Sequence, residues 1–490
     1  MLIGRTRENY NPKDQAFHVC VDGFTLRNVK IKNFSFGVHT YGRYTKTGDY
    51  TVPEIPNKNW LIEGCSITDT VMGLQLSEID GITVKDSVIT GFCPETFPEG
   101  TYGQDSNYDG HYYPQAHIFD FLGGLHNVYL SSNCLNVRIN NVTMGNSTGD
   151  AIHKAFPPKA DKDLKQFIRA DISKNHFYTD ISINKVNSPL TIGIVSENVM
   201  CDNIFATDLR YCIYLSTADN CIVSNSYLSA TRADFPRKGQ PQNDNPNICI
   251  YTEDASKCWF QNTHLCYNGV HRRASDVFNE ASVISRGFNR IMSENKKHRR
   301  NYIGDNFDIN NYMLKFTGCD MVSTYGITNY YFEELMRGNE TDWLKIAVSE
   351  YWDNCSLNIC TGENLFRLKC LNNLSKGLTI RNSYFYNKHA NGSARALFRF
   401  QCAQQGCDCG CYWGGRGKKF PYIHLENVVF DNAGKYDKIS SKWEYLTSIM
   451  NEGFFNHSDA INVSGSYINN CYRMSLDGSK KITEFIDKLD

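Results

Sequence analysis

The sequence predicts an all-β chain folded as a right-handed parallel β-helix. The main observation is an eight-residue pattern that recurs along the chain: apolar, any, apolar, any, Asn, any, any, apolar. A second is the spacing, since Trp60 to Ile82 and Val199 to Cys221 are both 22 residues apart. Alternate apolar residues indicate short strands with one buried face. Such strands bury a continuous core only when parallel coils stack at about 4.8 Å.

The copies of the pattern account for most of the chain. The clear copies begin at Phe24, Trp60, Ile82, Val137, Val199, Cys221, Cys258, Leu314, Leu378, Ile423 and Ile461. A weaker copy begins at Ile181, 44 residues after Val137, which is twice the 22-residue spacing. Longer gaps predict insertions at about 92–120, 157–178, 232–247, 270–313, 325–355, 388–420 and 433–457.

The fifth position of the pattern predicts a ladder of polar turns. It holds Asn28, Asn141, Asn203, Asn225, Asn262, Asn382 and Asn427, or Asp86, Gly64, Gly318 and Gly465. Stacked Asn amides can donate to and accept from the next coil, and Gly suits a turn with positive φ. Asn or Asp often returns two positions after the last apolar residue: Asn33, Asp69, Asn146, Asp208, Asn387, Asn432 and Asn470. A β-sandwich, the alternative for alternating strands, gives no reason for Asn at one register.

The domain organisation follows from the repeat. Residues 1–478 are expected to form one β-helix domain with insertions, and residues 479–490 a short amphipathic helix that caps its end. Ile482, Phe485 and Ile486 have helical spacing. Helix-like sequences within 329–354 are interpreted as parts of an insertion.

Composition limits the partners. Lys plus Arg is 51 and Asp plus Glu is 52, so the basic excess of a nucleic-acid-binding protein is missing. No apolar run reaches the roughly 18 residues of a membrane span. The first residues have no apolar signal core, which predicts cytoplasmic synthesis and reduced thiols for the 19 cysteines.

A column of polar residues is expected on one outer face of the coils. Alignment of the strand that follows the Asn turn places these residues in the column: His39, Gln75, His153, Tyr214 and Tyr251. Glu253 follows two residues after Tyr251, and Glu197 is assigned to an intervening coil. Aromatic, imidazole and carboxylate groups in one stripe suit a sugar-binding groove. An ordinary polar surface is the alternative.

Residues 124–217 resemble the central coils of the pectin-lyase-like superfamily, most of all its polygalacturonase branch (glycoside hydrolase family 28). The family sequence N-T-D corresponds to Gly124-Leu125-His126, and G-D-D to Gly149-Asp150-Ala151. G-H-G corresponds to Thr191-Ile192-Gly193, and R-I-K to Tyr214-Leu215-Ser216. The resemblance implies the β-helix fold and places Asp150 where these hydrolases keep a catalytic carboxylate. At the other catalytic positions of the family, this sequence has different residues.

The chemistry at Asp150 stays open between two reaction types. Glycoside hydrolysis needs an acid and a base or nucleophile, and His153, His126 or Glu197 could be the partner of Asp150. A lyase needs a base and a group that neutralises a carboxylate, for which the candidates are Tyr214, His153, Lys154 and Arg232. A turn aspartate that bonds backbone amides is the structural alternative for Asp150.

A cysteine cluster in an insertion is a candidate zinc site, formed by Cys402, Cys407, Cys409 and Cys411. Four thiolates can hold zinc, although two consecutive C-x-C steps are not the usual ligand spacing. Free thiols or disulfides are the alternatives, and no other cofactor is expected.

The sequence therefore supports two alternative hypotheses for the function, which belong to different classes. One is a carbohydrate-active β-helix that binds and cleaves a polysaccharide, similar to a phage tailspike depolymerase. The other is a non-catalytic structural or receptor-binding protein that has lost the catalytic acids. The resemblance to tailspikes implies a homotrimer and a virion or cell-surface location. Nucleic acid and membrane are not expected partners.

Overall fold

The structure is a computed structural model, and the residues it describes are almost all in strands or the turns between them. These residues are 1–4, 14–40, 43–47, 50–91, 126–130, 134–147, 149–154, 173–186, 188–192, 196–209, 211–216, 218–230, 248–253, 257–267, 283–286, 314–323, 327–330, 349–359, 366–369, 377–387, 398–401, 423–431, 436–437, 442–443, 447–450, 461–469 and 479–481. None of them is in a helix. The all-β prediction is confirmed, and no helix in this part of the chain has the length and apolarity to cross a membrane.

The chain divides into two compact units, residues 1–247 with 269–279 and residues 248–268 with 280–490. Each contains strands of two mainly parallel sheets, here called the first and the second sheet. In unit 1 the first sheet holds β1 (Leu2–Ile3), β3 (Thr25–Arg27), β4 (Lys30–Lys32), β8 (Asn57–Glu63), β9 (Ser66–Thr70), β11 (Ile79–Gly91), β13 (Cys134–Gly145), β15 (Ser173–Val186), β17 (Ser196–Leu209), β19 (Ala218–Ser224) and β20 (Tyr227–Ala230). The second sheet holds β2 (Gln15–His18), β5 (Phe36–His39), β10 (Met72–Leu76), β12 (His126–Leu130), β14 (Ile152–Lys154), β16 (Leu190–Ile192) and β18 (Tyr211–Ser216).

Unit 2 repeats the arrangement. Its first sheet holds β22 (Cys258–Gln261), β23 (His264–Tyr267), β25 (Leu314–Thr317), β26 (Asp320–Ser323), β28 (Ser349–Asp353), β29 (Ser356–Ile359), β31 (Gly377–Arg381), β32 (Tyr384–Asn387), β34 (Ile423–Glu426), β35 (Val429–Asp431), β39 (Ile461–Ser464), β40 (Tyr467–Asn469) and β41 (Ser479–Lys481). Its second sheet holds β21 (Ile248–Glu253), β24 (Val283–Arg286), β27 (Ile327–Tyr330), β30 (Phe366–Lys369), β33 (Phe398–Gln401) and β38 (Thr447–Met450). Two hairpins lie outside these sheets, β6 (Arg43–Thr47) with β7 (Tyr50–Ile55) and β36 (Tyr436–Asp437) with β37 (Lys442–Trp443).

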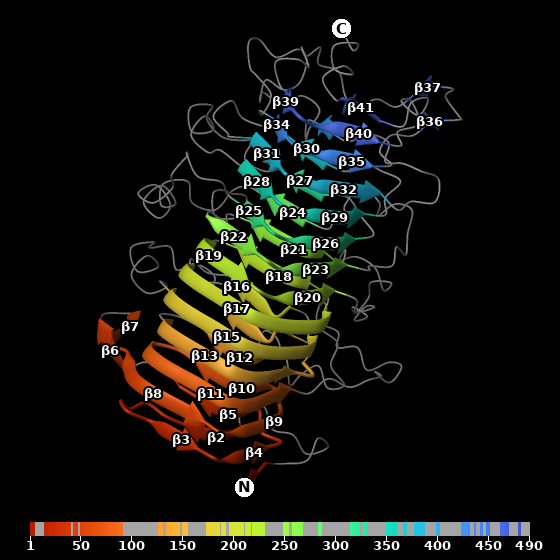
Figure 1. The fold of residues 1–490 in the computed structure, drawn as a ribbon. Helices are drawn as coiled ribbons and strands as arrows, with labels where there is room; N and C mark the ends of the chain where they lie inside the picture. The colour runs from red at the N-terminus through yellow and green to blue at the C-terminus, as the bar shows by residue number, and fades with distance from the viewer. Residues whose placement is uncertain are drawn as a thin grey trace, which may run out of the picture. The chain divides into compact units, whose positions relative to one another are not determined.

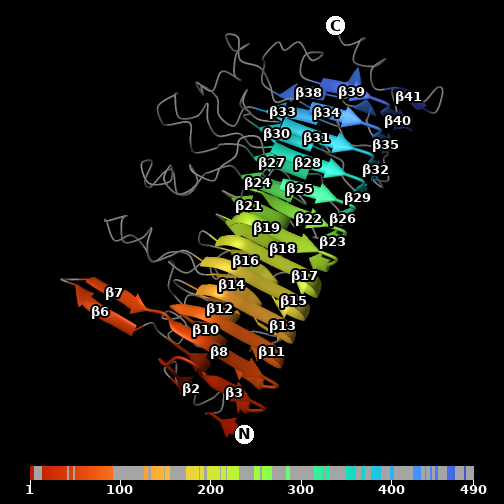
Figure 2. The ribbon, with the colours of Figure 1, turned by 60° about the vertical axis from the view of Figure 1, so that its left-hand side comes forward.

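Successive coils stack in register, as the parallel β-helix requires. Ile82 of β11 lies opposite Trp60 of β8 on one side and Val137 of β13 on the other. In Figures 1 and 2 the chain of unit 1 crosses the first sheet, bends, and returns along the second sheet before the next coil begins. The apolar positions of the pattern form the core: Ile62, Val84 and Ile139 are all fully buried. The predicted solenoid is confirmed.

The polar turn has the conformation that its residues predict. The Asn and Asp residues at the fifth position have positive φ, for example 50° at Asn141 and 54° at Asn203. Asn141 donates through Nδ2 to Oδ1 of Asp86 at 2.7 Å. Where Gly64 takes the place, an added Cβ would lie 2.4 Å from Oδ1 of Asn28, so glycine leaves room for the neighbouring amide.

A further ladder, which the repeat pattern did not predict, lies one residue before four successive coils of the first sheet. Asn136, Asn175, Asn198 and Asn220 all have positive φ. Each of the last three donates from Nδ2 to Oδ1 of the Asn on the preceding coil, at 3.1, 3.2 and 2.7 Å. These Asn residues satisfy one another in a chain along the solenoid.

Two coils begin at polar residues that the apolar pattern cannot recognise. The copy expected from Ile181 begins at His176, because Arg138 lies opposite Phe177 and Ile139 opposite Tyr178. His176 is buried because its Nδ1 contacts Tyr178 Oη at 2.6 Å and its Nε2 contacts the Cys134 carbonyl at 2.8 Å. In unit 2 a missed copy begins at Glu350, which is also buried, with Trp352 Nε1 donating to its Oε2 at 3.4 Å.

Strands also occupy parts of the expected insertions. They are Ser173–Tyr178 of 157–178, β24 of 270–313, β27 and Ser349–Asp353 of 325–355, β33 of 388–420, and β36, β37 and β38 of 433–457. The prediction of helix-like segments within 329–354 is wrong for the described residues of that range, which are all in strands or the turn at Asn354. The helix expected at 479–490 is not formed over Ser479–Lys481, which pair antiparallel with β40. Residues 482–490 lie outside the described part of the chain.

Candidate active site

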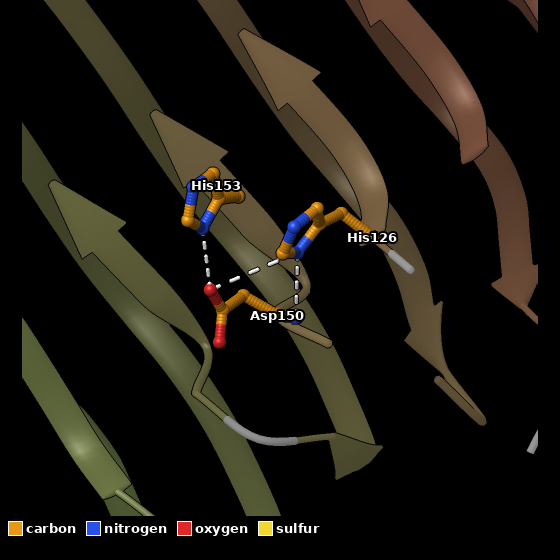
Figure 3. Close-up of side chains that lie close together, drawn as sticks. All are labelled: His126, Asp150 and His153. Atoms are coloured by element: carbon orange, nitrogen blue, oxygen red, sulfur yellow. Dashed lines mark hydrogen bonds and ion pairs between the residues drawn. The ribbon is translucent and has the colours of Figure 1, made fainter. Parts of the chain in front are cut away.

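A cluster of one carboxylate and two imidazoles lies on the second sheet of unit 1. His126 opens β12, His153 is the middle residue of β14, and Asp150 lies two residues before β14 begins. The strands are parallel neighbours, with Val128 opposite Ile152 and Tyr129 opposite His153. Figure 3 shows the carboxylate of Asp150 directed toward His153 and close to the ring of His126. The fold therefore joins residues that are 24 apart in the sequence.

The local backbone fixes where Asp150 stands. The Asn127 N–H donates to the Asp150 carbonyl at 3.1 Å, and the Ala151 N–H donates to the Ser188 carbonyl at 2.8 Å. On the preceding turn the Gly149 N–H donates to Ser147 Oγ at 3.2 Å. These bonds connect the backbone around Asp150 to the coils on both sides and fix the position from which its side chain extends.

Asp150 contacts the two histidines through different groups. Its Oδ2 lies 2.6 Å from Nδ1 of His153, a short distance typical of a charge-assisted hydrogen bond. Its backbone N–H donates to Nδ1 of His126 at 2.9 Å. Nδ1 of His126 and Oδ2 of Asp150 are 3.7 Å apart. The carboxylate thus holds His153, while the amide holds His126.

The rings form a compact stack. His126 and His153 have ring centroids 4.0 Å apart and planes 20° from parallel. Tyr129 lies 5.5 Å from each of the two histidine rings. Burial raises the pKa of the Tyr129 phenol, so at neutral pH this ring is uncharged. Aromatic faces confine the imidazoles to one orientation.

Exposure separates the roles that the three side chains can take. The side chains of His126 and Asp150 are 4% exposed, whereas that of His153 is 13% exposed. A carboxylate this buried, with one oxygen bonded to His153, is better placed to orient the imidazole than to touch a polymer. With a carboxylate bonded at Nδ1, the second ring nitrogen of His153 is the atom that can accept or return a proton.

The same three residues have the composition of a metal site, since one ligand atom from each lies within 4.8 Å of the others. Their hydrogen bonds argue for a different use. Nδ1 of His126 accepts the Asp150 amide, and Oδ2 of Asp150 is bonded to His153. A metal ion that used these atoms would displace both bonds, and the two rings are stacked rather than converging on a point. The arrangement is that of an oriented imidazole.

The predicted polar column exists as a register. Within unit 1, paired residues run across the second sheet in the order His18, His39, Gln75, Tyr129, His153, Thr191, Tyr214. Tyr129 and Thr191 were not predicted to lie in this column. The position of His39 on an exposed face is a wrong prediction, because its exposure is only 2%. Gln75, His153 and Tyr214 are partly exposed.

The remaining candidates differ in where the structure places them. Glu197 lies on β17 of the first sheet, opposite Lys174 and Asp219, rather than on the strand face of His153. Lys154 is 1% exposed, so its predicted contact with a substrate carboxylate is wrong. Tyr251 and Glu253 lie on β21 of unit 2. Arg232 and the cysteines Cys402, Cys407, Cys409 and Cys411 lie outside the described residues.

Most of the described thiols lie in the core. Among the described residues, eight cysteines are buried, including Cys134 and Cys201. Burial raises the pKa of Cys134 to about 11 and that of Cys201 to about 12, so both remain neutral thiols. They pack as small apolar side chains.

No protein-family model matches the chain, and no curated protein matches it. A solved catalytic domain of a GH87 alpha-1,3-glucanase variant, in complex with tetrasaccharides, is 11% identical with a TM-score of 0.33, over 93% of this chain and 65% of that one. A second such domain, in complex with nigerose, is 10% identical with a TM-score of 0.31, over 92% and 63%. PfbA, a surface adhesin of Streptococcus pneumoniae, is 11% identical with a TM-score of 0.24, over 96% and 85%.

The chain thus spans less than two thirds of the length of these glucanase domains. At such low identity and TM-score the comparisons assign no activity, and the fold rests on the strand pairings described above. The resemblance to family 28 stays a prediction from the sequence.

Proposed function

We propose that this β-helix binds and cleaves a polysaccharide, and that His153 transfers the proton in the cleavage. The observation that carries the proposal is the 2.6 Å contact between Asp150 Oδ2 and His153 Nδ1, at a partly exposed imidazole. A carboxylate bonded to Nδ1 fixes the tautomer, leaves the other nitrogen basic and stabilises the imidazolium that forms. His153 is then the catalytic residue and Asp150 a positioning residue.

The surroundings of His153 support an extended ligand. Its register neighbours on the second sheet are Tyr129 and Thr191, followed by Tyr214. Tyr214 and Gln75 are partly exposed. Hydroxyl, amide and aromatic groups on successive coils can bind successive sugars of a polymer that runs along the sheet. Tyr214→Phe is expected to weaken binding modestly, because it removes a hydroxyl and keeps the ring.

Two reactions are compatible with this base. In hydrolysis His153 accepts a proton from the water that attacks the anomeric carbon, the glycosidic C–O bond breaks, and the leaving oxygen takes a proton from solvent. In elimination His153 accepts the proton next to a uronate carboxylate, the C–O bond on the neighbouring carbon breaks to leave a C=C double bond, and the leaving oxygen takes a proton from solvent. The assay is incubation with a panel of neutral and acidic polysaccharides. Hydrolysis creates a reducing end without a double bond, whereas elimination creates an unsaturated, ultraviolet-absorbing end. Cleavage of a panel member that persists at full rate in His153→Gln would refute the role of His153.

Binding without cleavage is the second candidate. It is supported by the residues at the N-T-D and R-I-K positions, Gly124-Leu125-His126 and Tyr214-Leu215-Ser216, which lack the acidic and basic groups of the family. The protein would then act as a receptor-binding or structural β-helix at a virion or cell surface. Saturable retention of a polysaccharide with no new chain ends after prolonged incubation would favour this candidate.

We also propose a homotrimer as the assembled form. Apolar side chains on the outer face of the first sheet support a buried contact, since Phe205 is 53% and Met200 38% exposed. The mass of one chain is 55.9 kDa. Light scattering at micromolar concentration should give about three times that mass, and a value near one chain would refute the trimer.

A further inference from the structure

The hydrogen bonds of Asp150 determine where the ring proton of each histidine lies. A carboxylate oxygen only accepts, so the 2.6 Å contact requires a hydrogen on Nδ1 of His153. A backbone N–H only donates, so the 2.9 Å bond requires Nδ1 of His126 to carry no hydrogen. We infer that Asp150 holds the stacked histidines in opposite tautomers, His153 as Nδ1–H and His126 as Nε2–H, and that His126 is a positioning residue for the reaction.

The inferred tautomers make the two rings unequal in their response to protons. A second proton on Nε2 of His153 would leave its bond to Asp150 at Nδ1 in place. His126 can become a cation only by accepting a proton at Nδ1, which would break its bond to the Asp150 amide. Protonation of His126 at Nδ1 therefore breaks a hydrogen bond, whereas a second proton on His153 does not.

The positioning role follows from two of the contacts that His126 makes. Its Nδ1 holds the N–H of Asp150, and its face supports the ring of His153 at 4.0 Å. Loss of the acceptor leaves a buried N–H without its bond, so the backbone of Asp150 moves to find another. Because the carboxylate moves with it, His153 is no longer held in one tautomer. This role rests on the proposed function, whereas the tautomers do not.

The tautomers can be measured without a substrate. Histidine labelled with nitrogen-15 gives different long-range proton–nitrogen correlations for Nδ1–H, Nε2–H and imidazolium rings. The wild-type protein should show a hydrogen on Nε2 but not on Nδ1 of His126, and a hydrogen on Nδ1 of His153, with signals assigned from His126→Asn and His153→Gln. A hydrogen on Nδ1 of His126 would overturn the inference. This result is independent of whether any polysaccharide is cleaved.

Two variants separate the acceptor of His126 from its ring. His126→Asn keeps an oxygen near the place of Nδ1 and loses the ring, whereas His126→Phe keeps a ring and loses the acceptor. On a polysaccharide that the wild type cleaves, His126→Phe should lower kcat by about 10²-fold with little change in KM, because catalytic groups are misplaced. His126→Asn should recover most of that loss. Equal kcat values for the two variants would overturn the positioning role.

If His126→Phe does not fold, His126→Asn still decides. With the acceptor retained, the His153 ring should keep the wild-type nitrogen signals and kcat should stay within about tenfold of the wild type. A changed tautomer at His153, or a kcat loss as large as that of His153→Gln, would overturn the role assigned to Nδ1 of His126.

Discussion

Two pairs of histidine rings stack across neighbouring strands of the second sheet in unit 1. His18 of β2 and His39 of β5 have centroids 5.2 Å apart, and His126 of β12 and His153 of β14 have centroids 4.0 Å apart. In the first pair, burial and then the charge of His18 lower the pKa of His39 to about 4, so that ring is neutral near pH 7. In the second pair, Asp150 supplies a carboxylate to one ring and a backbone amide to the other.

The contrast between the two pairs shows how the candidate site differs from ordinary packing in a solenoid. Parallel stacking places like residues beside one another wherever they recur at one register, so stacked imidazoles alone indicate packing. A role in catalysis requires that a residue contact a partner of a different chemical type. Ladder residues of the first sheet show the same rule, since Asn198 bonds Asn175 and Asn220 bonds Asn198 in a repeating way. Asp150 instead contacts two rings through two kinds of group.

The largest expected effect is on the rate of cleavage, and it distinguishes the two histidine pairs. His153→Gln should slow cleavage by about 10²–10⁴-fold, because the group that transfers the proton is lost. His39→Gln, the matched control in the other pair, should leave kcat within a few fold. Rates are to be compared on the same polysaccharide at equal folded fraction. A larger loss in His39→Gln than in His153→Gln would reverse the assignment.

The next effect compares two carboxylates. Asp150→Asn keeps the shape but removes the charge that holds the His153 proton, so turnover should fall by about 10²-fold or more, with little change in folding. Asp202 accepts ladder bonds from Asn225 and Ser224 on the first sheet, and Asp202→Asn should leave turnover unchanged. Equal rates for Asp150→Asn and the wild type would remove Asp150 from the mechanism.

Acid should destabilise the protein through its neutral buried histidines. The folded-state pKa of His39 is lowered to about 4 by burial and by His18, while the unfolded chain takes a proton below about 6.5. Stability present above pH 6.5 is therefore lost as the pH falls toward 4. Between pH 7 and 5 this one group accounts for about 1–2 kcal/mol. Burial also lowers the pKa of His176, to about 3, and adds a loss of the same sign.

The measurement is urea unfolding followed by circular dichroism at both pH values. His39→Gln should show a smaller decrease in unfolding free energy between pH 7 and 5 than the wild type. His153→Gln serves as the comparison from the other pair. An unchanged pH dependence in His39→Gln would show that the buried ring of His39 does not contribute.

The smallest effect concerns one turn of the ladder. Asn225 has φ of 48° and donates to Asp202 at 2.8 Å. Asn225→Gly keeps the backbone conformation and loses the hydrogen bond, which should cost about 1 kcal/mol of unfolding free energy. Asn225→Ala adds the strain of a Cβ at positive φ, about 1 kcal/mol more. Chemical unfolding of both variants checks the order, and an Ala variant as stable as the Gly variant would contradict it.

The sequence was sufficient for the fold because the solenoid is built from local rules that repeat. Each coil carries its own apolar alternation and its own turn residue, such as Asn203 or Gly64, and these specify a strand and a bend without distant information. The rule failed where burial depends on a specific partner. His176 and Glu350 stand at apolar positions because Tyr178, the Cys134 carbonyl and Trp352 satisfy them inside the core.

Only part of the candidate site could be predicted from the sequence. Asp150 and His153 are three residues apart, so their meeting on one coil could be predicted. Their contacts with His126 and Tyr129, the burial of His39 and Lys154, and the separation of Glu197 onto the first sheet were decided by the tertiary structure. The physical reason is that a residue in a β-helix contacts residues of the next coil, which stacks at about 4.8 Å. Insertions change how many residues separate the two coils in the sequence, but they do not change this stacking.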